Sequence, residues 1–218
     1  MAKIVVIYSG GMDSFTVLNK AVTDNHNVYA LSFDYGQKHN KELIYAKQAC
    51  QDLKIFHKIL EIQSIASLFT SSSLVSHKID LPDGHYAASN MVSTVVPNRN
   101  MILISLAIAY AVNIGAEGVW YGAHASDHLI YPDCRPAFVD IMDKASKIAN
   151  FDPVYVHAPY LKTDKMGVLK AGMAMQLDYS KTWTCYKGLE KACGTCGSCI
   201  ERLEAFKKNN LVDPVKYF

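Results

Sequence analysis

Short β-branched runs alternate with helix-forming segments along the first 160 residues, and this alternation constrains the fold more than any other feature. The expected strands span residues 3–8, 27–33, 55–62, 118–121 and 154–157. The expected helices begin near residue 13 and span 40–51, 100–114, 138–148 and 163–176. Strands joined by helices form parallel sheets through right-handed crossovers. The sequence therefore predicts an α/β fold with a doubly wound, mostly parallel sheet.

Two segments depart from this alternation. Residues 65–93 carry the serine run 71–73 and the turn 82–84 (PDG), and we expect a long surface loop or lid there. Four cysteines crowd into residues 185–199, close to the end of the chain. We therefore expect a main α/β domain over residues 1–178 and a metal-binding tail with a C-terminal helix over residues 179–218.

Composition narrows the class of protein. Half of the 218 residues are apolar and the formal net charge is +2, which favours a globular protein with a small-molecule substrate over one that binds nucleic acid directly. The apolar stretch 101–114 is shorter than the roughly 20 residues that cross a bilayer. Residues 1–8 lack the features of a signal peptide, so we expect a cytoplasmic protein without membrane contact.

The segment 9–14 (SGGMDS) follows the first strand and opens the first helix. Glycines let backbone N–H groups approach phosphate oxygens, and a helix N-terminus adds free donors and partial positive charge. The segment lacks the lysine of a Walker A loop and the spacing of a dinucleotide-binding loop. It predicts a phosphate-binding loop, and the plainer alternative is a serine-glycine turn in which Asp13 caps the helix.

The cysteines divide into two groups. Cys193, Cys196 and Cys199 form C-x-x-C-x-x-C, and together with Cys185 they can close a tetrahedral shell around one Zn²⁺. An iron-sulfur cluster is the alternative, although no proline follows the last cysteine as it does in bacterial ferredoxins. Cys50 is interpreted as a small core residue. For Cys134 the interpretation is left undecided between a core residue and a residue of the functional site, because it lies in the segment 131–135 described below.

The phosphate loop resembles the pyrophosphate loop (PP-loop) of ATP pyrophosphatases, which adenylate an oxygen of the substrate and release pyrophosphate. That resemblance implies that Asp13 holds Mg²⁺ or orders the loop. It assigns catalytic roles to Ser9, Asp13, Ser14 and Lys162; Lys162 and Lys165 both fall where the family has a lysine beside the phosphates. The implied ATP-binding residues are Tyr8, Ser9, Gly10, Gly11, Met12, Asp13, Ser14, Phe15, Thr16, Val17 and Leu18.

Four further segments make the resemblance specific. They are residues 34–39 (DYGQKH), 96–100 (VPNRN), 131–135 (YPDCR) and 182–186 (TWTCY). With the phosphate loop and the cysteines, they resemble the 7-cyano-7-deazaguanine synthase family. The resemblance implies an ATP-dependent carbon-nitrogen ligase that converts 7-carboxy-7-deazaguanine and ammonia into the nitrile during queuosine biosynthesis, with Mg²⁺ and one Zn²⁺ per chain.

The same segments supply side chains suited to a fused heteroaromatic acid. Tyr35 or Tyr131 can stack on the ring, and Asp133 can accept hydrogen bonds from guanine-like N–H groups. The cations that can bind the carboxylate or phosphates are Lys38, Arg99 and Arg135. His39 follows Lys38 directly in the sequence. These seven residues are the expected substrate contacts.

The chain departs from the family pattern at two places. Asn98 replaces the usual glycine, and Leu129-Ile130 replaces the usual Ser-Gly beside the expected substrate pocket. Asparagine tolerates a left-handed backbone better than most residues, so the turn at residue 98 is expected to persist. The bulkier pair at 129–130 is expected to alter the loop beside the substrate.

Two other functions are considered. A tRNA-thiolating ATP pyrophosphatase would need a catalytic cysteine pair and an RNA-binding face, but Cys50 and Cys134 are far apart in sequence. A non-catalytic zinc module that binds nucleic acid would leave the phosphate loop without a role. The oligomeric state is left open, with a homodimer as one option.

Overall fold

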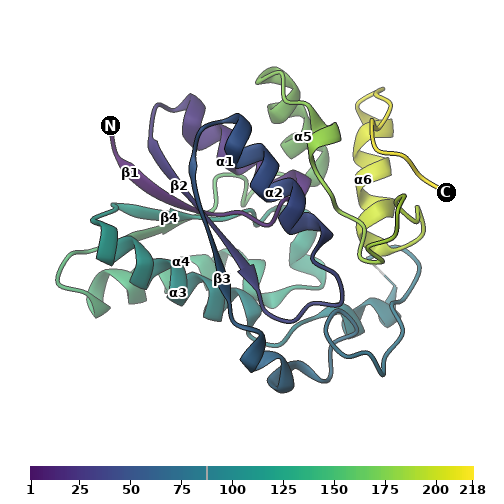
Figure 1. Ribbon diagram of the computed structural model, residues 1–218, viewed down its shortest axis with the longest axis horizontal. Helices are drawn as coiled ribbons and strands as arrows, with labels where there is room; N and C mark the ends of the chain where they lie inside the picture. Colours follow the sequence, from purple (N-terminus) through teal and green to yellow (C-terminus); the bar gives the residue numbers. More distant parts are fainter. Residues whose placement is uncertain (87) are drawn as a thin grey trace.

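A parallel sheet of five strands forms the centre of the computed structural model, which describes residues 1–86 and 88–218 (Figure 1). Residue 87, inside the expected loop 65–93, lies outside the described residues. The strands are β1 (Lys3–Ile7), β2 (Asn27–Asp34), β3 (Phe56–Glu61), β4 (Gly118–Trp120) and β5 (Tyr155–His157). Their order is β3-β2-β1-β4-β5. β2 and β3 are therefore added on one side of β1, and β4 and β5 on the other side.

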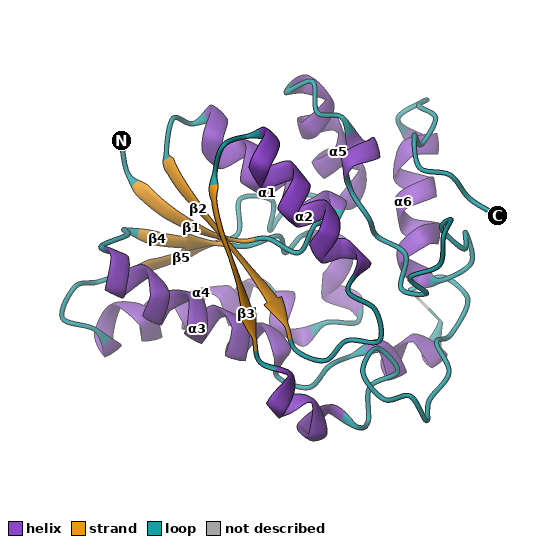
Figure 2. Ribbon diagram, viewed as in Figure 1, coloured by secondary structure: helices purple, strands orange, loops and turns teal. Residues whose placement is uncertain are grey.

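Helices cover both faces of this sheet (Figure 2). They are α1 (Met12–Thr23), α2 (Lys41–Asp52), α3 (Arg99–Ile114), α4 (Pro136–Ala149), α5 (Lys165–Ala174) and α6 (Gly197–Lys208). Alternate residues of a strand face opposite sides, and β1 shows this directly: Val5 packs with α3 and α4, whereas Ile4 and Val6 pack with α1 and α2. The predicted doubly wound α/β fold is confirmed.

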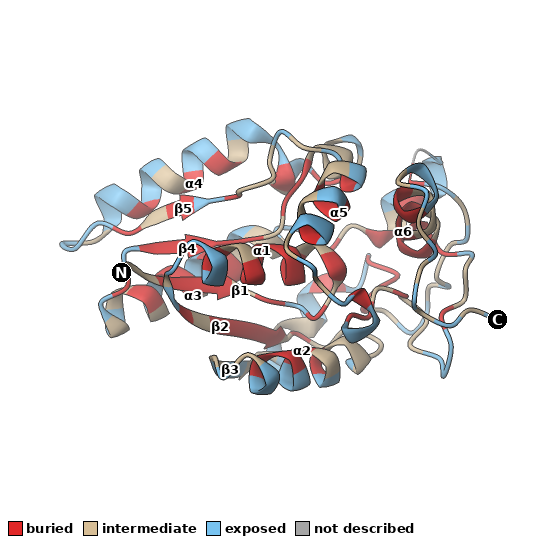
Figure 3. Cartoon of the chain, turned by 90° about the horizontal axis from the view of Figure 1, so that it is seen from above, coloured by how far each residue is buried: buried red, intermediate tan, exposed pale blue. Residues whose placement is uncertain are grey.

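Burial follows the same layers (Figure 3), with buried residues on the sheet and on the helix faces turned toward it. The helix stretch Ser89–Ile114 is long and apolar enough to cross a membrane by length and composition. Its α3 part places Ile104, Ala107 and Ala111 in the core beside β1 and β4. These residues give α3 the packing of a core helix.

Asn98 precedes α3 with φ 59° and ψ 15°, the left-handed conformation expected at this position. Asp133 lies across from it and accepts a hydrogen bond from the Asn100 backbone N–H at 3.0 Å. The VPNRN and YPDCR segments therefore meet at the start of α3.

The expected surface loop 65–93 is more ordered than its serine content indicates. Two short 3₁₀ helices, Gln63–Phe69 and Ser89–Thr94, flank it. Ser72 and Ser73 are fully buried, and Tyr86 and Met91 pack into the core. The segment is irregular because it packs through individual side chains, and it contributes Leu74 and Tyr86 to the cavity described below.

The C-terminal helix α6 packs against α5 at the edge of the main body (Figure 1). Ala205 and Phe206 join the apolar cluster that holds α1 to the sheet. Arg202 is 1% exposed and makes a two-pronged ion pair with Asp213, at 2.7 and 2.9 Å. The tail is therefore fixed to the α/β core by both apolar and ionic contacts.

Candidate active site

The phosphate loop, Ser9–Ser14, connects the carboxyl end of β1 to the N-terminus of α1. Ser14 Oγ donates to the Gly11 carbonyl at 3.1 Å and lies 2.9 Å from Ser9 Oγ, while the Ser9 N–H donates to Ser14 Oγ at 3.2 Å. No side chain among the described residues caps α1. The first-turn N–H groups of α1 are therefore available to an anion.

Gly10 has the backbone conformation that the loop needs. Its φ is +93°, and a Cβ atom there would lie 2.1 Å from the Glu42 carbonyl oxygen. The Gly10 carbonyl also accepts a hydrogen bond from the Trp183 N–H at 3.0 Å. The TWTCY segment, residues 182–186, is thereby held directly against the phosphate loop.

A chain of alternating charges lies beside the loop. Lys165 Nζ is 3.3 Å from Asp13 and 3.5 Å from Glu201, and His124 lies 3.5 Å from Asp13 and 3.6 Å from Asp127. Burial alone would raise the pKa of Asp13, but Lys165 and His124 outweigh it and hold that pKa well below its ordinary value. Asp13 is thus an ionised carboxylate at the mouth of the loop.

The neighbouring carboxylates also shift the pKa values of Lys165 and His124. Burial opposes the charged form of each, yet Asp13 and Glu201 raise the pKa of Lys165 above its ordinary value. Asp127 and Asp13 likewise raise the pKa of His124. Positive charge is therefore maintained beside the loop, where a polyphosphate would need it.

A cavity of about 240 Å³ opens from the phosphate loop toward the TWTCY segment. Its walls are rich in tyrosine, and three of the hydroxyls hydrogen bond in a row: Tyr86 to Tyr186 at 2.6 Å and Tyr186 to Tyr131 at 3.4 Å. The aromatic lining also includes Tyr8, Phe33, Tyr35, Tyr121 and Trp183. A planar, partly polar ring can stack and hydrogen bond in such a space.

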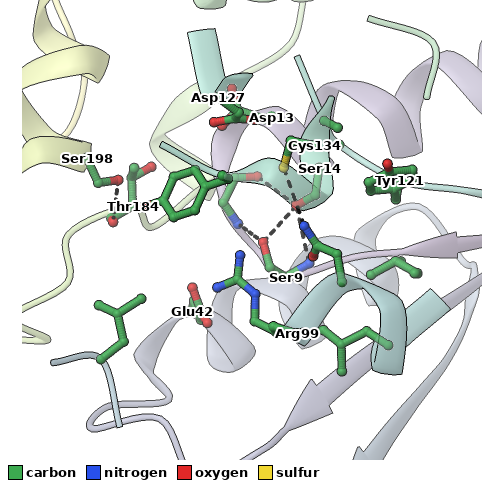
Figure 4. A pocket seen from close by; sticks show the side chains of 18 of the residues that line it. Ser9, Asp13, Ser14, Glu42, Arg99, Tyr121, Asp127, Cys134, Thr184 and Ser198 are labelled. Atoms are coloured by element: carbon green, nitrogen blue, oxygen red, sulfur yellow. Dashed lines mark hydrogen bonds between the residues drawn. The ribbon is translucent and has the colours of Figure 1, made fainter. Parts of the chain in front are cut away.

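Arg99 and Glu42 both line this cavity, and their side chains lie next to each other near Ser9 (Figure 4). Burial raises the pKa of Glu42 to about 7, against the lowering effect of Arg99. Arg99 also interacts with Tyr35 and Asp133, which raise its pKa although burial would lower it. Arg99 therefore supplies a positive charge to the cavity wall.

The structure brings some of the predicted residues to the cavity and leaves others outside it. Those that line it are Tyr8, Ser9, Gly11, Asp13, Ser14, Tyr35, His39, Arg99 and Tyr131. Gly10 shapes the loop, whereas the predicted ATP-binding residues Met12, Phe15, Thr16, Val17 and Leu18 are buried on α1, outside the lining. These five residues hold α1 in place, because its buried face packs on the sheet.

Four of the predicted residues lie outside the cavity lining. Lys162 is exposed and outside the cavity, whereas Lys165 lines it, because Asp164 caps α5 and the next residue begins the helix beside Asp13. Lys38 donates to the Ile79 carbonyl, Arg135 donates to the His128 carbonyl, and Asp133 is engaged at the start of α3. None of these three lies in the cavity lining.

Several lining residues were not identified from the sequence. Glu42, Asp127, Tyr86 and Ser198 come from four separate segments, and Glu201 reaches the site through Lys165. Cys134, left open above, is buried beside the cavity, where Asn100 donates to its sulfur at 3.4 Å. The Asp-Lys pair 164–165 is a helix-start signal that could have favoured Lys165.

The bulky pair at residues 129–130 lies outside the cavity lining. Leu129 is 72% exposed, and Ile130 packs at the margin of the core. Asp127 and Tyr131 on either side of the pair do line the cavity. The replacement of Ser-Gly by Leu129-Ile130 therefore adds no side chain to the cavity lining.

The four cysteines of the tail form a candidate metal centre. The sulfur atoms of Cys185, Cys193, Cys196 and Cys199 all lie within 4.8 Å of one another. Backbone N–H groups of Thr195 and Cys196 donate to the Cys193 sulfur at 3.4 and 3.3 Å. Four thiolates around one Zn²⁺ would be about 3.8 Å apart, given Zn–S bonds near 2.3 Å. The donor set fits a single metal ion.

Comparison with known proteins gives consistent matches over the whole chain. The family model described as "Queuosine biosynthesis protein QueC" matches residues 3–210. The relative named 7-cyano-7-deazaguanine synthase 2, from Colwellia psychrerythraea, is 76% identical over 217 residues, covering 100% of this chain and 99% of its own. The 7-cyano-7-deazaguanine synthase of Hahella chejuensis is 61% identical, covering 99% of this chain and 93% of its own.

Solved structures with the same architecture are more distant. The NH3-dependent NAD synthetase of Campylobacter jejuni has a TM-score of 0.51 at 20% identity and covers 95% of this chain and 75% of its own. The U34-tRNA thiolase NcsA of Methanococcus maripaludis, solved with its [4Fe-4S] cluster, has a TM-score of 0.52 at 15% identity, covering 96% and 66%. At these identities, the likeness shows the shared fold alone.

Proposed function

Because the chain belongs to the QueC family of queuosine biosynthesis proteins, we propose that it is an ATP-dependent 7-cyano-7-deazaguanine synthase. Its reaction would convert 7-carboxy-7-deazaguanine, ammonia and ATP into the nitrile. The observation that carries this proposal is one cavity lined both by the phosphate-loop residues Ser9, Gly11, Asp13 and Ser14 and by Arg99 and several tyrosines. A nucleotide and an aromatic acid could meet there.

The phosphate loop would hold the pyrophosphate portion of ATP. Its N–H groups and the hydroxyls of Ser9 and Ser14 can donate to phosphate oxygens, and Lys165, in place of the predicted Lys162, adds a buried positive charge. Asp13 would hold Mg²⁺, which neutralises charge on the phosphates when bound. This arrangement leaves the α-phosphorus open to attack by the acid.

The aromatic end of the cavity would hold the deazaguanine ring. Tyr35 and Tyr131 supply the stacking surface proposed from the sequence, and Arg99 lies where it can bind the carboxylate. His39 lines the cavity and lies beside Gly188 of the tail. Lys38, Asp133 and Arg135 support the loops around the site instead of contacting the ring.

Conversion of a carboxylate into a nitrile removes two oxygens, so it requires two activations. The acid would attack the α-phosphorus of ATP and release pyrophosphate, and ammonia would then displace AMP to give the amide. The amide oxygen would then attack the α-phosphorus of a second ATP and release a second pyrophosphate, and loss of AMP and a proton would form the nitrile. One site can serve both steps if the amide rebinds in the position of the acid.

The cysteine cluster would hold one Zn²⁺ as a structural centre. An all-thiolate shell leaves no ligand position open for water, which is typical of structural zinc sites. An iron-sulfur cluster remains the competing assignment, and metal analysis of the purified protein separates the two.

The proposed partners are small molecules in the cytoplasm, without direct binding of nucleic acid. The near-neutral charge balance supports this, as does the packing of one face of the apolar helix α3 against the core. We propose residue 178 as the boundary between the α/β domain and the metal-binding tail. It separates two groups of sequence motifs rather than two independent folding units, because α6 of the tail packs on α5 of the main domain. A homodimer is kept as the candidate oligomer, which sedimentation velocity would test.

Mass spectrometry of the products formed from ATP, ammonium and 7-carboxy-7-deazaguanine tests the function. We expect nitrile with two AMP per turnover. Synthetic amide supplied with ATP but without ammonium should give nitrile with one AMP. Formation of ADP without AMP would contradict adenylation, and inert amide would contradict the shared intermediate. Tight tRNA binding at physiological salt, with sulfur transfer, would instead favour the thiolase alternative.

A further inference from the structure

Glu201 is a buried carboxylate that the reaction described above does not use. Its side chain is 9% exposed, and it lies on α6, in the cysteine-rich tail, rather than on the α/β core. Among the described residues, its ionic partner is Lys165. The Lys165 ammonium nitrogen is 3.5 Å away, and the lysine side chain is 7% exposed. A carboxylate buried to this extent needs a compensating charge, and Lys165 provides it.

Lys165 is shared between two carboxylates from different parts of the chain. Asp13 on the phosphate loop lies 3.3 Å from its nitrogen, and Glu201 lies 3.5 Å from it. A lysine side chain has four rotatable bonds, so a single ion pair would leave the ammonium free to follow Asp13. The second carboxylate adds a charge contact on the α6 side of the ammonium, at ion-pair distance and without a hydrogen bond to Glu201 Oε2 among the described residues.

Glu201 is itself held on both sides along α6. Cys199, two residues before it, belongs to the cysteine cluster. Arg202, the next residue, donates to Thr182 and Thr184 at 2.7 and 3.1 Å and pairs with Asp213. Because these contacts fix the first turns of α6, the position of Glu201 relative to the TWTCY segment is set by the tail.

We propose that Glu201 is a positioning residue that holds the Lys165 ammonium beside the phosphate loop, so that the tail sets the geometry of phosphate binding. This inference rests on the proposed use of ATP. Glu201 does not contact the nucleotide in this proposal; it acts through Lys165. The tail then contributes to catalysis by a defined ion pair in addition to holding the fold together.

The alternative is that Glu201 only subtracts positive charge from the site, and the two roles predict opposite results for E201Q. If the carboxylate only weakens the local positive potential, its removal should tighten ATP binding and leave kcat unchanged. If it positions Lys165, kcat should fall about tenfold or more, since one partner of a buried ion pair is lost, and ATP binding should not tighten. The KM for the carboxylic acid should change less than twofold.

The matched control is E204Q, which makes the same change three residues further along α6. Glu204 is 42% exposed and pairs at the surface with Lys208, so its replacement should leave kcat and ATP affinity within twofold of the parent. Metal content and melting temperature of both variants show whether α6 remains folded. Equal kcat in E201Q and the parent protein would overturn the proposal.

A double-mutant cycle covers the case in which E201Q loses activity for structural reasons. If Glu201 acts through Lys165, E201Q should have little further effect on ATP affinity and kcat in a K165M background. Additive losses would overturn the proposal. ATP affinity, measured by equilibrium dialysis, does not depend on the identity of the acid. A protein that binds ATP as described but forms no nitrile would contradict the proposed function and leave this inference intact.

Discussion

At the scale of single residues, Gly10 has the strictest requirement in the site. It combines φ +93° with a position where a Cβ atom would lie 2.1 Å from the Glu42 carbonyl oxygen. We expect Gly10→Ala to move the phosphate loop away from α2, weaken ATP binding at least tenfold and lower the free energy of unfolding by about 2 kcal/mol or more. Calorimetric ATP titration and urea unfolding measure the two effects.

Gly115→Ala is the control for this prediction. Gly115 also has positive φ, at +64°, but no atom of the described residues lies within 4 Å of the position of its Cβ. This variant should show only the backbone cost, about 1–2 kcal/mol, and normal ATP binding. If Gly10→Ala matched Gly115→Ala in both measurements, the close approach to α2 would be unimportant.

Glu42 makes the stability of the protein depend on pH. Its pKa is about 7 in the folded state, mainly because of burial, against an ordinary value of 4.5. The folded state keeps this proton up to about pH 7, whereas the unfolded chain loses it near pH 4.5. The contribution of Glu42 to stability therefore falls as pH rises through that window and is constant above it.

Glu42→Gln should remove this dependence. Between pH 5 and pH 8, the stability of the variant should rise relative to the parent by about 1–3 kcal/mol, discounted for partial contact with solvent. Urea unfolding at the two pH values measures the difference, and Glu61→Gln, an exposed site on β3, serves as control. A difference that shrinks toward pH 8 would contradict the assignment.

The sequence predicts residues whose roles follow from local motifs. The phosphate loop is a continuous segment, and the four cysteines fall within residues 185–199, so each group is close in sequence and each is close in the structure. Glu42, Asp127 and Glu201 reach the site only because separate elements pack together, and no local pattern distinguishes them from surface acids. Lys162 lies in the turn before α5, and the cap at Asp164 makes Lys165 the first residue of the helix, beside Asp13.

At the scale of secondary structure, the regular elements are predicted well and the irregular segment is not. Buried parallel strands and amphipathic helices have distinct periodicities, which is why the expected bounds agree closely with the structure. Residues 65–93 have no periodicity, and the burial of Ser72 and Ser73 depends on tertiary contacts. Serine content alone indicates solvent exposure, and here that indication is wrong.

Helix α6 depends on Arg202 for its attachment. The guanidinium is 1% exposed and donates to Thr182, Thr184 and the Tyr179 carbonyl in addition to its pair with Asp213. Arg202→Ala leaves Asp213 as an unpaired buried carboxylate, so we expect a loss of about 3–5 kcal/mol in the free energy of unfolding. Lys207→Ala, exposed on the same helix, should change it by less than about 0.5 kcal/mol. A loss below 1 kcal/mol in Arg202→Ala would show that the apolar contacts of α6 suffice.

At the scale of the whole molecule, the cysteine centre and the phosphate loop are linked through the TWTCY segment. Trp183 donates to the Gly10 carbonyl, and Cys185, two residues later, belongs to the cysteine cluster. Without a metal ion, four thiol groups have no common partner to hold this segment and α6 in register. The free energy of metal binding should therefore contribute to ATP binding as well as to folding.

Removal of the metal should thus weaken ATP binding even though no cysteine of the cluster lines the cavity. We expect Cys196→Ser to lose the metal and to bind ATP at least tenfold more weakly, a coupling of about 1.4 kcal/mol or more. Elemental analysis and ATP titration of the same samples measure both effects. Cys50→Ala, a buried thiol on α2 outside the cluster, should keep the metal and the ATP affinity. If metal-free Cys196→Ser stayed folded and bound ATP as tightly as the parent, the tail would stabilise the chain without acting on the site. Retained metal with weakened ATP binding would instead place the coupling in the protein contacts of α6, because the ion would then be unnecessary for it.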